Sequence, residues 1–97
     1  MNVVLLPPSD EELEEAIRYY DDQLEGLGQQ FNDCFLDTIR YIESGPDSWK
    51  KVGEHTRRAN IKLFPYLVLY VHEQETIVVT CIAHQHREPQ YYLYRVW

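Results

Sequence analysis

The stretch Thr76–Arg95, TIVVTCIAHQHREPQYYLYR, joins an apolar run to a polar segment, and the rest of the chain has to be arranged around it. The run Thr76–Ala83 is rich in β-branched residues and lies between a charged turn and a proline, which predicts a buried strand. The dozen residues that follow, His84–Arg95, hold two histidines, two arginines and three tyrosines. Imidazole, guanidinium and phenol groups suit the gripping or cleavage of a phosphodiester. We therefore expect a functional site where this strand ends.

Each residue of this segment also has a structural interpretation. A histidine after a strand often caps a sheet edge, and tyrosines near a C-terminus commonly pack on the core with wet hydroxyls. That interpretation suits His86 and Tyr94 best. The spacing His-x-x-Arg-x-Pro-x-Tyr-Tyr favours a site, because the proline fixes its own φ angle and turns the chain. The turn is expected to bring His84, Arg87 and Tyr91 near one another.

The composition predicts one globular domain spanning residues 1–97. The hydrophobic content is 44%, and the length is near the lower limit for a self-sufficient core. No stretch resembles a membrane span or a signal peptide, so the expected location is the cytoplasm. Cys34 and Cys81 fall on predicted apolar faces and are expected to be reduced. No metal-ligand motif occurs, and we predict neither a metal nor a cofactor.

The net charge of −7 is unevenly distributed along the chain. Residues 1–47 hold 12 acidic and two basic side chains, a charge of −10, whereas residues 48–97 hold four acidic and seven basic ones, a charge of +3. All four histidines lie in the second half. The sequence therefore predicts an acidic helical layer and a mildly basic opposite face.

Two helices are predicted after a short strand at Val3–Leu6. Ser9 is expected to begin the first helix in a capping box with Glu12. Each helix has one apolar stripe at spacings of three and four residues, which are Leu13, Ala16, Ile17, Tyr20, Leu24 and Leu27 in the first and Phe31, Cys34, Phe35, Thr38, Ile39 and Ile42 in the second. The short connection at Gly26-Leu27-Gly28 predicts an antiparallel αα-hairpin.

Three strands are predicted in the second half of the chain, over Arg57–Leu63, Leu67–Val71 and Ile77–Ala83. The first alternates, with Ala59, Ile61 and Leu63 on one face and Arg58, Asn60 and Lys62 on the other. The expected fold is α+β. An antiparallel sheet, formed by the first short strand and a three-stranded meander, carries the αα-hairpin on one face and is followed by a short C-terminal segment. On the partly open face, Arg58 and Lys62 should lie beside the segment His84–Arg95.

Several short motifs occur in a characteristic order: Ala16-Ile17-Arg18-Tyr19-Tyr20, Gly26-Leu27-Gly28 followed by Phe31, Pro46 with Trp49, Arg58 ahead of Phe64-Pro65-Tyr66 with Tyr70, and His84-x-x-Arg87-x-Pro89-x-Tyr91-Tyr92. With them, nearly the whole chain resembles the RelE/ParE toxin superfamily of bacterial type II toxin–antitoxin systems, most closely its ParE-like plasmid-stabilisation branch. Two positions depart from the family pattern, which usually has a basic residue at His86 and a tryptophan at Tyr92. The resemblance implies a small toxin neutralised by an antitoxin that wraps it.

The resemblance leaves two targets open. A ParE-like toxin inhibits DNA gyrase without catalysis, and its target-binding residues would be Arg57, Arg58, Lys62, His84, Arg87, Tyr91, Tyr92 and Arg95. A RelE-like toxin enters the ribosome and cleaves mRNA without a metal, with His84 or Tyr91 in acid–base roles and Arg58 and Arg87 on the phosphate. The net negative charge of the chain favours gyrase over the ribosome as the target, because ribosomal RNA would repel an acidic protein. An inactive relative that only binds is a third alternative. Expected assemblies are a homodimer or a heterotetramer with the antitoxin.

Overall fold

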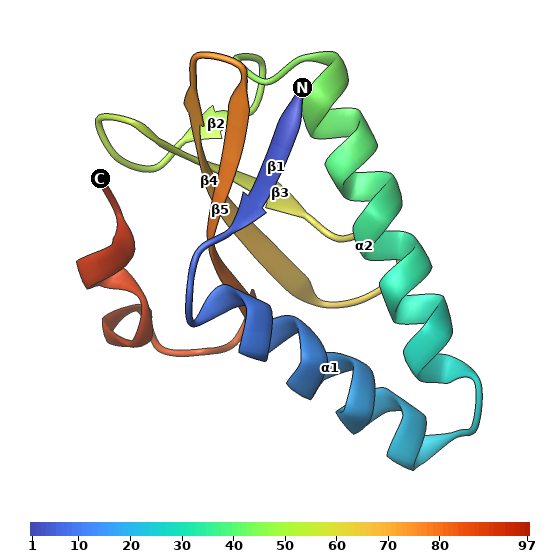
Figure 1. The fold of residues 1–97 in the computed structure, drawn as a ribbon. Coiled ribbons are helices and arrows are strands. Elements are labelled where there is room, and N and C mark those ends of the chain that lie inside the picture. The colour runs from blue at the N-terminus through green and yellow to red at the C-terminus, as the bar shows by residue number, and fades with distance from the viewer.

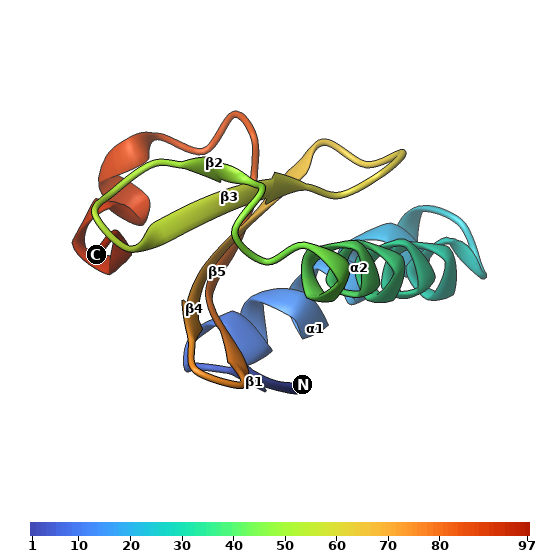
Figure 2. The same cartoon turned by 90° about the horizontal axis from the view of Figure 1, so that it is seen from above.

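A five-stranded sheet, a helical pair on one of its faces and a C-terminal segment on the other make up the structure (Figures 1 and 2). The computed structural model describes all 97 residues. Its elements are β1 (Asn2–Leu5), α1 (Ser9–Gln23), α2 (Leu27–Ser44), β2 (Lys50–Lys51), β3 (Thr56–Asn60), β4 (Tyr66–Glu73), β5 (Thr76–His84) and two short 3₁₀ helices, η1 (Pro89–Tyr91) and η2 (Leu93–Arg95). The strand order is β1-β5-β4-β3-β2. The α+β class, the αα-hairpin and the antiparallel meander β3-β4-β5 are as expected.

The sheet is mixed rather than antiparallel, because β1 runs parallel to β5, with Asn2 opposite Thr76 and Leu5 opposite Val79. Nothing in the composition of a short apolar strand specifies its direction, and the long connection between the two strands allows parallel pairing. A second difference is β2, whose two lysines pair with Arg58 and Arg57. A strand of two residues is too short to show alternation, so it could not be predicted from the sequence.

The helical pair is held to the sheet by the expected stripe of α2. All six of its predicted positions are buried, and all of them except Thr38 join residues of α1, β3, β4 and β5 in one core cluster. Gly28 allows the two helices to approach each other, since a Cβ there would lie 2.4 Å from the Ile17 carbonyl oxygen. Asp21 caps the connection, where its carboxylate accepts hydrogen bonds from the amides of Gly26 at 3.0 Å and Gly28 at 3.2 Å.

Three local predictions are wrong. Leu24, predicted on the apolar stripe of the first helix, lies at the C-terminal cap of α1 with 65% of its surface exposed. Leu63 does not face the core but lies in a turn after β3, with a positive φ of 72° and 74% of its surface exposed. The capping box at the start of α1 is also absent. Ser9 is fully buried and its hydroxyl donates to the carbonyl oxygens of Leu6 at 2.6 Å and Val79 at 3.0 Å. Glu12 therefore uses its carboxylate elsewhere.

The face of the sheet away from the helices is partly covered by the C-terminal segment. Tyr91, Tyr92 and Val96 pack on a second buried cluster, which consists of Leu67, Leu69, Cys81 and Ala83. The Trp97 carbonyl accepts hydrogen bonds from the His55 and Thr56 amides at 2.7 and 2.9 Å, and this fastens the segment to β3. Both cysteines are buried and unpaired, as predicted. No helix has the length and apolar character that crossing a membrane requires.

Candidate functional site

The site forms where β5 continues past the end of β1. β1 pairs with β5 only as far as Val79, and beyond this point two β5 backbone groups are bonded by side chains instead. The Ile82 amide donates to Glu12 Oε1 at 3.0 Å, and the Thr80 carbonyl accepts from Arg95 Nη1 at 2.9 Å. The ion pair between α1 and the C-terminal segment therefore supplies the hydrogen bonds that a neighbouring strand would otherwise make to β5.

The Glu12–Arg95 pair is buried and bidentate. Arg95 Nη1 lies 3.0 Å from Glu12 Oε1 and Nη2 lies 2.9 Å from Oε2, while the two side chains are only 6–7% exposed. The Tyr91 hydroxyl also donates to Glu12 Oε2. Burial alone would lower the pKa of Arg95, but the hydrogen bond to the Glu12 carboxylate holds it above its ordinary value. A buried pair needs this degree of hydrogen bonding to offset desolvation.

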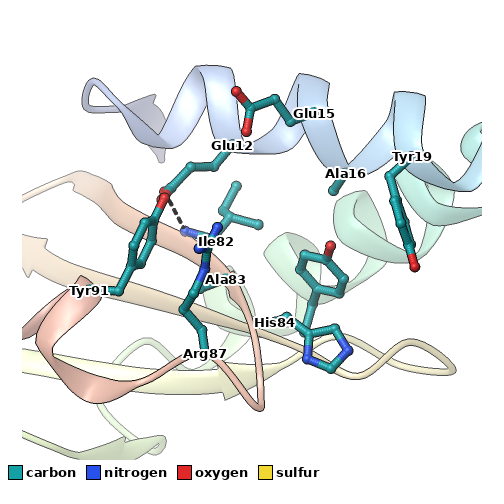
Figure 3. A pocket seen from close by; sticks show the side chains of 10 residues that line it. Glu12, Glu15, Ala16, Tyr19, Ile82, Ala83, His84, Arg87 and Tyr91 are labelled. Carbon is teal, nitrogen blue, oxygen red and sulfur yellow. Dashed lines mark hydrogen bonds between the residues drawn. The ribbon is translucent and has the colours of Figure 1, made fainter.

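A cleft of about 290 Å³ lies next to this pair, between α1 and the end of β5 (Figure 3). Ala16 and Tyr19 line it from α1, and His84, Arg87 and Tyr91 line it from the other side. The Arg87 guanidinium lies 4.0 Å from the centre of the Tyr91 ring, a cation–π contact. The predicted convergence of these last three side chains is thus realised.

Hydrogen bonds and burial restrict the acid–base chemistry of two residues in the cleft, His84 and Tyr91. His84 Nδ1 accepts a hydrogen bond from the His86 amide at 3.1 Å, so a neutral His84 carries its proton on Nε2. Burial raises the pKa of Tyr91, and its hydrogen bond to Glu12 raises it further. Tyr91 is therefore unsuited to giving up its proton near neutral pH. What remains available to a ligand is the Arg87 cation, the His84 ring and aromatic surface.

The other predicted cations lie elsewhere. Arg58 is opposite Leu69, on the face covered by the C-terminal segment, whereas His84 is opposite Tyr66, whose ring packs on Phe31 under the helices. The expected shared face for Arg58 and His84 is therefore wrong. Arg58 instead lines a separate hollow of about 360 Å³ with Trp49, Lys50, Val52 and Asn60.

Four more residues that were predicted to contact a target differ in exposure. Arg57 Nη1 donates to the Trp49 carbonyl at 2.7 Å, which ties it to the loop before β2. Lys62 is exposed in the turn after β3, and Tyr92 is half-buried against the second cluster. Arg95, predicted to touch a target, is buried in its pair with Glu12 and supports the segment from within.

Glu12 is the site residue that sequence reasoning missed. Glu12, Ala16 and Tyr20 follow one another at spacings of four residues, and all three are buried on α1. A carboxylate on the buried stripe of a helix signals an interior partner, because charged side chains are almost never fully buried unless paired. The capping interpretation of Ser9 and Glu12 hid that signal.

The sequence matches a known family of bacterial toxins. Residues 3–89 match the sequence model described as the ParE toxin of the type II toxin–antitoxin system parDE. The chain belongs to the ParE toxin family. Because the match ends at residue 89, the ParE-family region includes Glu12, His84 and Arg87 but not Tyr91 or Arg95. No curated protein sequence matches the chain significantly.

The fold is that of a solved ParE-type structure. A chain from the "Chromosomal ParDE TA system from P. aeruginosa" superposes with a TM-score of 0.74 over 87% of this chain and 95% of that chain. The two sequences are 9% identical, so the likeness concerns the fold alone. Family membership makes this chain a toxin of a type II toxin–antitoxin system.

Proposed function

We propose that this toxin inhibits DNA gyrase by binding it and is neutralised by a cognate antitoxin. Family membership supplies the toxin class, and one observation favours binding over RNA cleavage. The cation Arg58 and the imidazole of His84 lie on opposite faces of the sheet, so a base and two phosphate-binding arginines do not meet around one phosphate. A binding toxin needs only an accessible surface of cationic and aromatic groups.

The contacts proposed for the target lie around the cleft. The exposed Arg87 lies at its rim, the half-buried His84 and Tyr91 line it, and Tyr92 adjoins them. The second hollow would add Arg58. Arg57, which lines another hollow with Asp47 and His72, and Lys62, exposed in the turn after β3, would be separate contacts. Arg95 acts by holding the segment that carries Tyr91, rather than by direct contact.

The antitoxin is proposed to cover the helical pair. Several large apolar side chains of this pair are unusually exposed, from 42% to 65% of their surface, namely Tyr19, Leu24, Leu36 and Tyr41. Contiguous exposed apolar surface commonly marks a protein interface. We further propose that residues 1–97 act as one domain in the cytoplasm, as a homodimer or in a heterotetramer with the antitoxin.

The test compares two arginine variants in a gyrase supercoiling assay. Arg87→Ala should lose inhibition and toxicity while the melting temperature stays unchanged, since removing an exposed cation costs under about 0.5 kcal/mol. The control is Arg40→Ala, an arginine on α2 with 72% of its side chain exposed, which should inhibit like the parent chain. Full inhibition by Arg87→Ala would remove the cleft from the mechanism.

An mRNA endoribonuclease remains the second candidate, because His84 and Arg87 do line one cleft and could act on a phosphate there. Cuts in mRNA during in vitro translation, with supercoiling unaffected, would establish it. A chain with neither effect and no toxicity would be an inactive relative that only binds.

A further inference from the structure

The free edge of β5 exposes one donor and one acceptor that the chain leaves unused. The Gln85 amide donates to the Pro65 carbonyl at 2.8 Å, and the alternation of an antiparallel ladder then directs the backbone groups of Ile82 and His84 away from β4. The bond from the Ile82 amide to Glu12 confirms that direction. β1 ends before this point, and the Ile82 carbonyl and the His84 amide have no turn, loop or side-chain partner.

These two groups lie at the floor of the cleft, because Ile82 and His84 both line it. Figure 3 shows what surrounds them: Glu15 and Tyr19 project from α1, and Arg87 lies on the opposite side. Neither Glu15 nor Arg87 takes part in an ion pair. The cleft thus combines a backbone donor and acceptor with one free carboxylate, one free cation and aromatic surface.

The arrangement of the backbone pair selects a kind of ligand. A carbonyl and an amide two residues apart on one strand edge offer an acceptor and a donor side by side, and a flat group with the complementary pair can bind both. The Watson–Crick edge of adenine is such a group, since its N6 amino group donates and its N1 atom accepts. Small-molecule sites commonly combine a few backbone groups with aromatic walls, and here the rings of Tyr19 and Tyr66 line the cleft.

We propose that the cleft binds a free adenine ribonucleotide, a ligand that goes beyond the proposed function. The adenine amino group donates to the Ile82 carbonyl, and N1 accepts from the His84 amide. The ribose hydroxyls donate to the Glu15 carboxylate, and the phosphate pairs with Arg87. The volume of about 290 Å³ suits a ligand of one nucleotide rather than a longer chain.

The charges of the cleft agree with the two ends of this ligand. The Tyr91 ring lies 4.0 Å from the Arg87 guanidinium and holds it in place, so the phosphate meets a cation that is already positioned. Glu12, the other carboxylate of the cleft, is neutralised by Arg95 and does not repel the phosphate. Glu15 is left to accept from the ribose hydroxyls, as acidic side chains do at other nucleotide sites.

The order of donor and acceptor along the edge favours adenine over other bases. Hypoxanthine and guanine carry a carbonyl oxygen where adenine carries its amino group, and this oxygen would face the Ile82 carbonyl. Turning the base over would restore the two hydrogen bonds but would carry the ribose away from Glu15 and Arg87. Cytosine has the same order as adenine on a single ring, which covers less of the tyrosine surface.

The probe is adenosine monophosphate (AMP), titrated into the ¹⁵N-labelled full chain. The His84 amide resonance should shift and saturate, and adenosine, which lacks the phosphate, should bind roughly three- to tenfold more weakly. Arg87→Gln should weaken AMP binding to the level of adenosine and leave adenosine binding unchanged, because the phosphate and the guanidinium form one pair. Arg40→Gln is the matched control and should bind AMP like the parent chain.

Analogues of the ligand test the backbone pair without any change to the protein. N6,N6-dimethyl-AMP has no amino donor and inosine monophosphate reverses the pair, so each should bind roughly tenfold more weakly than AMP. Equal binding by either analogue, or an unmoved His84 resonance, would overturn the proposal. Tighter binding by the dinucleotide ApA than by AMP would assign the cleft to RNA and overturn the choice of a free nucleotide. None of these measurements involves gyrase, an antitoxin or toxicity, so their failure is distinguishable from failure of the proposed function.

Discussion

Replacing Glu12 by Gln tests how much the structure depends on its buried ion pair. Gln keeps an acceptor for the Ile82 amide and nearly the same shape, but it leaves the Arg95 charge buried without a counter-ion. Removing one partner of a buried pair typically costs about 3 to 5 kcal/mol. Small domains have a total stability of roughly 5 to 15 kcal/mol, so the variant should lose a large fraction of it.

Urea denaturation and thermal melting measure that loss. At about 4 to 8 °C per kcal/mol for a chain of this size, even 3 kcal/mol would lower the melting temperature by at least about 12 °C. The control is Asp37→Asn, which breaks the exposed Asp37–Arg40 pair and should cost less than about 1 kcal/mol. The double variant Glu12→Leu with Arg95→Met removes the buried charge but leaves the Ile82 amide and the Thr80 carbonyl without partners, so it should recover only part of the loss.

The reasoning would be refuted by a Glu12→Gln variant as stable as the control. In that case the guanidinium of Arg95 would have to be solvated, and the C-terminal segment would not be held to α1 by charge.

Three further predictions concern the core, the hairpin and pH. Leu69→Ala should cost roughly 2 to 5 kcal/mol in urea melts, because Leu69 is 1% exposed in the second cluster. Gly28→Ala should lower the melting temperature, since its Cβ would meet the Ile17 carbonyl oxygen at 2.4 Å and push the helices apart. The hydrogen bond between His72 and Asp47 raises the pKa of the first and lowers that of the second. The stability gained from it should be greatest between their ordinary values of 6.5 and 3.8 and decline on both sides, which melting curves of the parent chain and Asp47→Asn across pH would reveal.

The parts of the fold that local periodicity encodes could be predicted from the sequence. The second helix shows this, because its six stripe residues face one surface and all are buried. Strand direction is not local, so the parallel pairing of β1 could not be read from Asn2–Leu5 itself. The two-residue β2 has no pattern to detect.

The site was predicted in its C-terminal part only. His84, Arg87 and Tyr91 do line one cleft, but the chain turns before Pro89, where the Arg87 amide donates to the His84 carbonyl, and Pro89 begins the short helix η1. Whether Arg58 and His84 share a face depends on the register of both strands with β4. Arg58 is opposite Leu69, and His84 is opposite Tyr66. Leu69 and Tyr66 are three positions apart, and residues an odd number apart on a strand point to opposite faces, so Arg58 and His84 do too. Glu12 was missed because a Ser and a Glu at that spacing also match a helix start, and only the tertiary structure decides between the two roles.

The pairing of Glu12 with Arg95 joins residues 83 positions apart and imposes an order on folding. The two helices make contacts that are near in sequence and can form early, whereas pairings between distant residues form slowly. Through that early stage Glu12 has no counter-ion, and the cluster of Leu67, Leu69, Cys81 and Ala83 has no cover. When the C-terminal segment docks, it supplies the counter-ion of Glu12 and covers this cluster in one step. We therefore expect this docking to come late, with the sheet exposed to aggregation until it does.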